Sequence, residues 1–167
     1  MESRRQLLAV IGAVLGLAPV AAWLSRSEPV STRANAHRFR VNKTEAEWRA
    51  ELNTQQYRVL REAKTERAYS SPLDHETRRG TFVCAACAQP LFSSTTKYDS
   101  GTGWPSFWAP LPNAVGTSVD RSFLMIRTEV HCLGCGGHLG HVFSDGPEPT
   151  GQRYCMNGIA MKFVPDA

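Results

Sequence analysis

Cys84-Ala85-Ala86-Cys87 and Cys132-Leu133-Gly134-Cys135 are the two stretches from which the architecture of this chain follows. Structural zinc takes four soft ligands in a tetrahedron, and a gap of two residues lets a tight turn direct both sulfurs at one ion. The pairs therefore predict one Zn²⁺ ion per chain, bound by Cys84, Cys87, Cys132 and Cys135. Four thiolates leave no open position for water or substrate, so we expect the ion to be structural.

The paired cysteines could instead form two redox dithiols or two disulfides. A thioredoxin-type dithiol lies where a strand meets a helix in a βαβ unit, and neither pair has that sequence context. Disulfides suit an oxidising compartment, so they stay an alternative for an exported protein. The pattern favours a zinc site over both.

The sequence around the paired cysteines is typical of β-structure. From Gly80 onward it contains short apolar or alternating runs separated by turns rich in Gly and Pro. The runs are Thr81–Val83, Ser122–Ile126 and Ile159–Val164, and the turns are Pro110–Gly116 and Gly146–Gly151. This texture predicts that the half of the chain after Gly80 is mostly antiparallel β-structure.

Two short helices are expected before the β region. Thr44 and Glu47 form a capping-box pattern, which predicts a helix from Glu45 to about Leu52. Thr54 is placed to cap a second helix, whose apolar face carries Tyr57, Leu60 and Ala63. We interpret both helices as packing elements.

Length and charge limit the class of protein. The 167 residues, of which 42% are hydrophobic, suffice for one compact domain. The formal charge of +4 includes Arg4, Arg5, Arg26 and Arg33 of the first 36 residues, so the remainder is nearly balanced and no nucleic-acid surface is expected. We divide the chain into an extension with its linker, residues 1–36, and a domain, residues 37–167.

The extension has the features of a targeting segment. Ser3-Arg4-Arg5-Gln6-Leu7-Leu8 is a twin-arginine signature, and an uncharged apolar run extends from Leu7 to about Leu24. It predicts export to the periplasm of a bacterium, with retention as an inner-membrane anchor as the alternative. Val20-Ala21-Ala22 and Ala34-Asn35-Ala36 both fit a cleavage site. Twin-arginine export moves folded proteins, which suits a chain that binds its metal before export.

Cys155 is the one cysteine left once four thiols bind zinc. A lone cysteine is more often a small buried apolar residue than a nucleophile. Here Arg153 is placed to favour a thiolate, and His138, His141 and Asp145 supply proton donors and acceptors. The combination points to cysteine chemistry at Cys155. The histidines could also be core residues or zinc ligands, although four cysteines already complete the metal shell.

Ser100–Trp108 is a glycine-bounded loop with three aromatic residues, Trp104, Phe107 and Trp108. Aromatic clusters usually belong to the core, but a loop that carries them can also form the wall of an apolar pocket. Both interpretations stay open on the residues alone.

From about Tyr57 to Pro165 the chain resembles the B-type methionine sulfoxide reductases, which act on the R epimer of the sulfoxide. The resemblance rests on four ordered segments, so chance agreement is implausible. They are Thr81-Phe82-Val83-Cys84-Ala85-Ala86-Cys87, Asp99-Ser100-Gly101-Thr102-Gly103-Trp104-Pro105-Ser106-Phe107, Cys132-Leu133-Gly134-Cys135-Gly136-Gly137-His138-Leu139-Gly140-His141-Val142-Phe143, and Pro149-Thr150-Gly151-Gln152-Arg153-Tyr154-Cys155-Met156-Asn157.

The resemblance implies a mainly β fold, with two small antiparallel sheets forming a barrel-like core, short N-terminal helices and zinc between the C-x-x-C turns. It implies that Cys155 attacks the sulfoxide sulfur and becomes a sulfenic acid, leaving methionine. The implied function is repair of oxidised proteins in the cell envelope during oxidative stress, with free methionine sulfoxide as a further substrate.

The resemblance also implies roles for the other site residues. His141 is the expected acid, and His138 and Asn157 help to hold the sulfoxide oxygen. Asp145 and Arg153 set the charge around the site. Trp104 packs against the S-methyl group of the substrate, and Phe107 supports that wall.

Two departures from the family pattern affect these expectations. Many relatives have a resolving cysteine where this chain has Thr102, so we expect an external reductant, a thioredoxin-like protein or a small thiol. Gly158 replaces a frequent serine, which we expect activity to tolerate. We expect a monomer. The rival hypothesis is a non-catalytic zinc-ribbon module that binds a protein partner through the aromatic loop.

Overall fold

The structure, a computed structural model, describes residues 39–167 of the chain. The predicted export signal, apolar run and cleavage sites lie outside the described residues. Within the described part, no helix is both long enough and apolar enough to cross a membrane.

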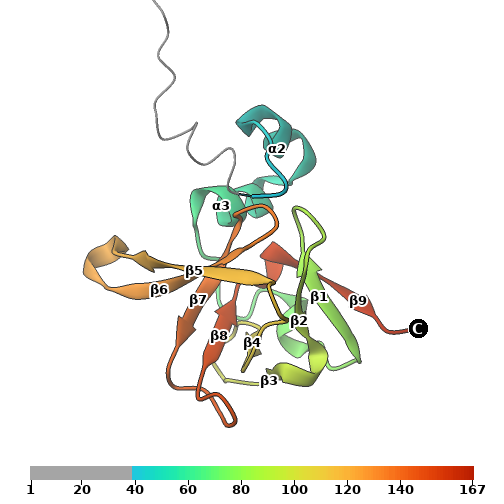
Figure 1. The fold of residues 1–167 in the computed structure, drawn as a ribbon, viewed down its shortest axis with the longest axis vertical. Helices are drawn as coiled ribbons and strands as arrows, with labels where there is room; N and C mark the ends of the chain where they lie inside the picture. Colours follow the sequence, from blue (N-terminus) through green and yellow to red (C-terminus); the bar gives the residue numbers. More distant parts are fainter. Residues whose placement is uncertain (1–38) are drawn as a thin grey trace, which may run out of the picture.

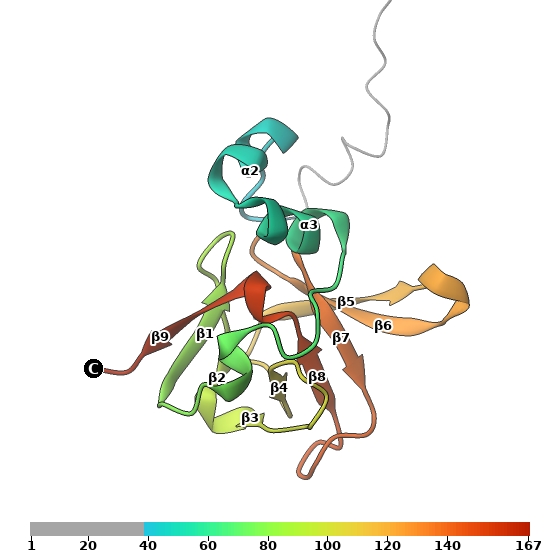
Figure 2. The ribbon, with the colours of Figure 1, turned by 180° about the vertical axis from the view of Figure 1, so that it is seen from behind.

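The domain is built from two antiparallel sheets (Figures 1 and 2). The three-stranded sheet has the order β2-β1-β9, with β1 (Gly80–Cys84), β2 (Pro90–Ser93) and β9 (Met161–Pro165). The six-stranded sheet has the order β3-β4-β8-β7-β6-β5, with β3 (Lys97–Tyr98), β4 (Ser106–Phe107), β5 (Val115–Asp120), β6 (Arg127–Cys132), β7 (His138–Phe143) and β8 (Arg153–Met156). The mainly antiparallel fold predicted from the sequence is confirmed.

The two sheets stay open, so the expected barrel-like closure is wrong for the described residues. The chain leaves β8 at Met156 and enters β9 at Met161 through a 3-10 turn, η4 (Gly158–Ala160). The Gly158 amide donates to the Glu66 carboxylate and the Ala160 amide to the Asn157 carbonyl. Because these amides bond to groups outside both sheets, the turn does not continue a strand from one sheet into the other.

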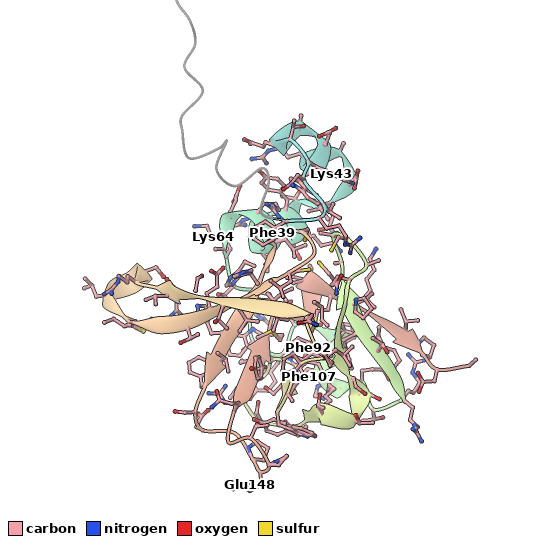
Figure 3. All side chains as sticks on the ribbon, in the orientation of Figure 1. Phe39, Lys43, Lys64, Phe92, Phe107 and Glu148 are labelled. Carbon is pink, nitrogen blue, oxygen red and sulfur yellow. The ribbon has the colours of Figure 1, made fainter. Side chains whose placement is uncertain are left out.

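Aromatic side chains fill the space between the sheets. Phe107 of β4 stacks on Phe92 of β2 with ring centroids 4.3 Å apart, and Phe82 of β1 meets the Phe107 ring edge-on at 4.9 Å. All three side chains are fully buried, and Figure 3 shows Phe92 and Phe107 side by side in the interior. Truncating such a residue to alanine typically costs about 3–5 kcal/mol.

The two helices are α2 (Glu45–Glu51) and α3 (Thr54–Glu62). The capping box at Thr44 is confirmed, because its side chain accepts from the Glu47 amide while the Glu47 side chain accepts from the Thr44 amide. The predicted cap at Thr54 is wrong. Asn53 caps α3 in a second capping box with Gln56. Its carboxamide oxygen accepts from the Gln56 amide, a capping role that the sequence assigned to the Thr54 hydroxyl.

The apolar run Ser122–Ile126 is not a strand. It begins with a 3-10 turn, η3 (Ser122–Leu124), and joins β5 to β6 at the tip of a hairpin. The Asp120 carboxylate accepts from the Ser122 amide at 2.8 Å, and Leu124 adopts a left-handed conformation with φ 58°. A local hydrogen bond from backbone to side chain therefore holds the start of this turn, which the apolar pattern did not reveal. Two further 3-10 turns are η1 (Pro72–His75) and η2 (Ser94–Thr96).

Ala63, the C-cap of α3, adopts a left-handed conformation with φ 51°. Because a Cβ is disfavoured there, Ala63→Gly should raise the free energy of unfolding by about 0.5–1 kcal/mol, measured by urea denaturation. Ala50→Gly, within α2, is the matched control and should lower it by about the same amount. Equal destabilisation by both variants would contradict this account of the cap.

Candidate active site and metal centre

The two C-x-x-C segments form turns of the same shape. In the first, the Cys84 amide donates to the Gln89 carbonyl and the Ala88 amide to the Cys84 carbonyl. In the second, the Cys132 amide donates to the Gly137 carbonyl and the Gly136 amide to the Cys132 carbonyl. The residue after each second cysteine has a positive φ, 58° at Ala88 and 69° at Gly136. Each turn therefore directs two sulfurs to one side.

The four sulfurs converge within 4.8 Å of one another. Cys84 Sγ lies 3.8 Å from Cys135 Sγ, and Cys87 Sγ lies 3.6 Å from Cys132 Sγ. Four sulfurs bound to Zn²⁺ at about 2.3 Å would be separated by about 3.8 Å, whereas a disulfide needs about 2.05 Å. The donor set and its spacing fit one tetrahedral metal and do not fit two disulfides.

The sulfur cluster connects the two sheets. Cys84 ends β1 of the three-stranded sheet, and Cys132 ends β6 of the six-stranded sheet. Hydrogen bonding among the sulfurs raises the pKa of Cys84 and lowers that of Cys87, because four thiols this close share protons and do not ionise independently. A bound divalent cation would allow all four to ionise, and it would tie the sheets together.

Cys155 lies on β8 between two polar neighbours on adjacent strands. It pairs with Ser106 of β4 and with His141 of β7. The pairing continues from His141 to Glu129 of β6 and from Glu129 to Ser118 of β5. Directly paired residues project from the same face of a sheet, so these five side chains form one polar row.

Burial raises the pKa of the Cys155 thiol, although contacts with Thr102 and the Arg153 charge act in the opposite direction. The Arg153 charge favours the thiolate, as predicted from the sequence, but desolvation is the larger effect. The resting thiol is therefore protonated near neutral pH.

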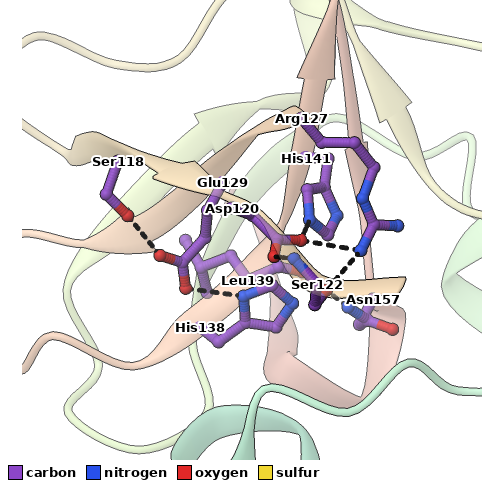
Figure 4. A network of polar contacts seen from close by, with 9 residues as sticks. All are labelled: Ser118, Asp120, Ser122, Arg127, Glu129, His138, Leu139, His141 and Asn157. Atoms are coloured by element: carbon purple, nitrogen blue, oxygen red, sulfur yellow. Dashed lines mark hydrogen bonds and ion pairs between the residues drawn. The ribbon is translucent and has the colours of Figure 1, made fainter. Parts of the chain in front are cut away.

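Each histidine of the site is bound to a carboxylate from the β5–β6 hairpin (Figure 4). His141 Nε2 lies 2.8 Å from Asp120 Oδ2, and His138 Nδ1 lies 2.8 Å from Glu129 Oε1. A carboxylate only accepts hydrogen bonds, so the hydrogen of a neutral ring is on Nε2 of His141 and on Nδ1 of His138. The His138 Nε2 atom is buried and has no hydrogen-bond partner within the described residues.

The charges around the histidines support this assignment. Burial lowers the pKa of His141 despite the opposing Asp120 carboxylate, so its ring is neutral near pH 7. The Ser122 amide, with His141 and Arg127, holds the pKa of Asp120 below its usual range. The bond from His138 lowers the pKa of Glu129 to about 2. Both carboxylates are therefore ionised and hold the rings in one orientation.

Arg153 and Asp145 form a bidentate ion pair with both N–O distances at 2.9 Å. The guanidinium also lies over the Phe143 ring, 4.4 Å from its centroid. A pocket of about 420 Å³ opens beside this pair, and one of its lining residues, Thr102, has its hydroxyl oxygen 3.8 Å from Cys155 Sγ. The pocket is lined by Tyr98, Asp99, Ser100, Thr102, Asp145, Gly146, Pro147 and Arg153.

Trp104 and Asn157 are tied to the segment that follows α3. The Trp104 indole Nε1 donates to the Glu66 carbonyl at 3.3 Å, and the Glu66 amide donates to Asn157 Oδ1 at 2.9 Å. The Asn157 amide nitrogen donates to the Leu139 carbonyl at 2.9 Å. Asn157 was expected to hold the sulfoxide oxygen, but its side chain is buried and bonded to backbone groups. It fixes the turn after Cys155 to β7.

Phe107 of the aromatic loop lies in the core. Its side chain is fully buried and stacks on Phe92, so the alternative interpretation of the loop, core packing, holds for this residue. Trp104 is half-buried and keeps part of its surface accessible.

Sequence reasoning missed three acidic residues, Asp120, Glu129 and Glu66. Asp120 and Glu129 bind the histidines, and Glu66 accepts from the amides of Gly158 and Ile159 at 2.5 and 3.0 Å. An acidic residue inside an alternating strand, such as Glu129 in Arg127–Cys132, was an available signal. Its partner could not be read from the chain.

Comparison with known proteins adds independent findings. The SelR domain family matches residues 52–165. The chain is 53% identical over 127 residues to the peptide methionine sulfoxide reductase MsrB of Agrobacterium fabrum. The aligned region covers 75% of this chain and 94% of that relative. The chain is 52% identical over 126 residues to the MsrB of Leptospira interrogans, and the aligned region covers 75% of this chain and 96% of that relative. The chain is 54% identical over 127 residues to the MsrB of Bradyrhizobium diazoefficiens, and the aligned region covers 75% of this chain and 91% of the relative.

Cys87→Ser should weaken metal binding and lower stability together, because binding of a structural metal is coupled to folding. We expect less than one metal ion per chain by elemental analysis and a melting temperature lower by about 10 °C or more. Cys155→Ser, outside the sulfur cluster, is the matched control and should keep both values. Full metal content in Cys87→Ser would remove Cys87 from the ligand set.

The raised pKa of Cys155 predicts the pH dependence of its alkylation. The thiolate fraction below the pKa rises about tenfold per pH unit, so reaction with iodoacetamide should still be accelerating at pH 8.5 in the metal-loaded protein. Arg153→Gln should slow the reaction at pH 8, because a charge that favours the thiolate is lost. A rate that is already constant above pH 7 would show that the thiol is ionised at rest.

Proposed function

The chain belongs to the SelR domain family and is a peptide methionine sulfoxide reductase, and on that premise we propose that it acts specifically on the R epimer of the sulfoxide in oxidised proteins. One observation carries the proposal. Cys155, the cysteine outside the four-sulfur cluster, is paired directly with His141, whose ring is held by Asp120. A soft nucleophile beside an oriented acid-base group is what sulfoxide reduction needs.

The proposed reaction transfers the sulfoxide oxygen to Cys155. The Cys155 sulfur attacks the substrate sulfur while the sulfoxide oxygen is protonated, which forms a transient S–S bond. The hydroxyl group then moves from the substrate sulfur to the Cys155 sulfur as the S–S bond breaks, and methionine leaves. The products are methionine and Cys155 sulfenic acid, so sulfur of the enzyme is oxidised and sulfur of the substrate is reduced. Thiol and sulfoxide together supply every atom of the two products.

The neutral His141 ring suits the proton transfer. Its Nε2 hydrogen is engaged by Asp120, which leaves Nδ1 as an acceptor for the proton of the Cys155 thiol. The imidazolium, stabilised by Asp120, then delivers that proton to the sulfoxide oxygen. His138 Nε2, buried and without a partner in the described structure, is the second group we propose at the oxygen. Asp145 and Arg153 hold the charge beside Cys155.

Selection of the epimer is proposed to depend on Trp104. An indole packed against the S-methyl group reads the shape at sulfur, and the bond to the Glu66 carbonyl fixes the plane of the ring. The opposite epimer would direct its oxygen at the indole and away from the histidines. No interaction of that oxygen would then offset the loss of its hydration.

Recycling of Cys155 is proposed to use an external thiol. Thr102 Oγ1 lies 3.8 Å from Cys155 Sγ, so a residue that cannot form a disulfide occupies the neighbouring position. The other four cysteines belong to the proposed structural zinc site. Two equivalents of thiol, from a thioredoxin-like protein or a small molecule, would reduce the sulfenic acid to thiol and water and become a disulfide.

The cellular setting is part of the proposal. The twin-arginine signature at Ser3–Leu8 supports export to the periplasm, with the apolar run to Leu24 as signal or anchor. The chain would then act as a monomer in repair of envelope proteins. The rival, a zinc-ribbon binding module, leaves the histidine–carboxylate pairs without a role.

Assays on peptides with separated R and S sulfoxides, using dithiothreitol as reductant, test the reaction. We expect the parent to reduce the R peptide at least a hundredfold faster than the S peptide, and Cys155→Ser to abolish reduction. Trp104→Ala should raise KM and reduce the preference for the R epimer. Trp108→Ala, in the same loop, is the matched control.

The proposal fails if Cys155→Ser reduces the R peptide like the parent. Parent activity on neither peptide would favour the binding module. Equal loss of epimer preference in Trp104→Ala and Trp108→Ala would assign selection to the loop as a whole.

A further inference from the structure

Residues 63–71, which we call the connecting segment, join α3 to η1 and form neither helix nor strand. Glu66 lies in the middle of this segment. Its neighbours Thr65 and Arg67 are exposed, whereas Glu66 itself is half-buried. The Glu66 carbonyl accepts from Trp104 Nε1 at 3.3 Å. The connecting segment therefore contacts the proposed substrate wall through the backbone of one inward-facing residue.

The side chain of Glu66 is bound to the turn that follows Cys155. Its carboxylate accepts from the Gly158 amide at 2.5 Å and from the Ile159 amide at 3.0 Å, and its own amide donates to Asn157 Oδ1 at 2.9 Å. Burial raises the pKa of this carboxyl group, while the two amide bonds act in the opposite direction and favour the ionised form. Hydrogen bonds to a charged group are roughly twice as strong as neutral ones. The carboxylate therefore attaches the connecting segment firmly to the turn.

The connecting segment also borders the aromatic loop. The Tyr69 amide donates to the Gly103 carbonyl at 2.7 Å, and the Tyr69 hydroxyl donates to the Gly101 carbonyl at 2.7 Å. A Cβ at Gly103 would lie 2.8 Å from the Tyr69 ring, so ring and loop backbone are in close contact. The aromatic loop, the connecting segment and the turn after Cys155 thus form one bonded set. Glu66 bonds to both the loop and the turn.

We infer that Glu66 is a positioning residue for selection of the sulfoxide epimer, and that it acts by fixing Trp104 relative to Cys155. The inference rests on the proposed function and deepens it. An indole can select one epimer by shape only if its distance from the attacking sulfur is constant. The Glu66 carbonyl holds the indole, and the carboxylate holds the same residue to the turn after Cys155. Without the carboxylate, residue 66 would keep one neutral bond to that turn, from its amide to Asn157.

Two substitutions and one matched control test the inference. Glu66→Ala removes both acceptors of the side chain. Glu66→Gln keeps one oxygen but places an amide donor against the second backbone amide. Glu47→Ala is the control, because the Glu47 carboxylate also accepts from a backbone amide, that of Thr44, in the capping box of α2 outside the site. The measurement is the ratio of kcat/KM for the R peptide to kcat/KM for the S peptide.

We expect Glu66→Ala to lower this ratio about tenfold, mainly by raising KM for the R peptide. Glu66→Gln should lie between Glu66→Ala and the parent, because one of the two bonds is retained. Glu47→Ala should lower the melting temperature but keep the ratio of the parent, because loss of the capping box destabilises the fold without moving the indole. If Glu66→Ala does not fold, Glu66→Gln provides the same test.

The double variant Glu66→Ala/Trp104→Ala separates positioning of the indole from general damage. If Glu66 acts through Trp104, the double variant should have the same ratio as Trp104→Ala to within about twofold. Independent effects on the ratio would multiply, because their free energies add.

Three results would overturn the inference: an unchanged ratio in both Glu66 variants, an equal fall of the ratio in Glu47→Ala, or effects that multiply in the double variant. A parent without any preference between the R and S peptides would instead refute the epimer specificity of the proposed function.

Discussion

Four cysteine sulfurs, contributed by turns that belong to different sheets, meet within 4.8 Å of one another. Thiolates at that separation repel, and thiols alone gain little from the contact, so a cation is what makes the arrangement favourable. Because Cys84 ends β1 and Cys132 ends β6, this one cluster sets how the sheets meet. The aromatic core of Phe82, Phe92 and Phe107 then fills the space between them.

The register of the six-stranded sheet is the second constraint, and it builds the site. Ser106, Cys155, His141, Glu129 and Ser118 form one row across five strands. A slip of one residue would turn Cys155 to the opposite face and separate it from His141. Gly140 helps to hold the register, because a Cβ there would lie 2.1 Å from the Cys155 carbonyl oxygen. β7 and β8 approach closely only with glycine at that position.

Burial and charge oppose each other at Cys155 and at His141, and burial prevails at both. The result is a protonated thiol beside a neutral imidazole. The thiol carries the one proton that the proposed oxygen transfer requires, and the imidazole has a nitrogen that can accept it. The carboxylates of Asp120 and Glu129 orient the two rings.

The sequence by itself determined the sulfur cluster, the capping box at Thr44 and the antiparallel character of the fold, because each depends on residue types at short spacing. It identified Cys155, His138, His141 and Trp104 by residue type and resemblance. Only the tertiary structure decided their partners: Asp120 is 21 residues from His141, and Glu66 is 91 residues from Asn157. It also moved Phe107 into the core and Asn157 into a backbone contact. Burial and strand register arise from residues distant in the chain, so no local pattern of the sequence encodes them visibly.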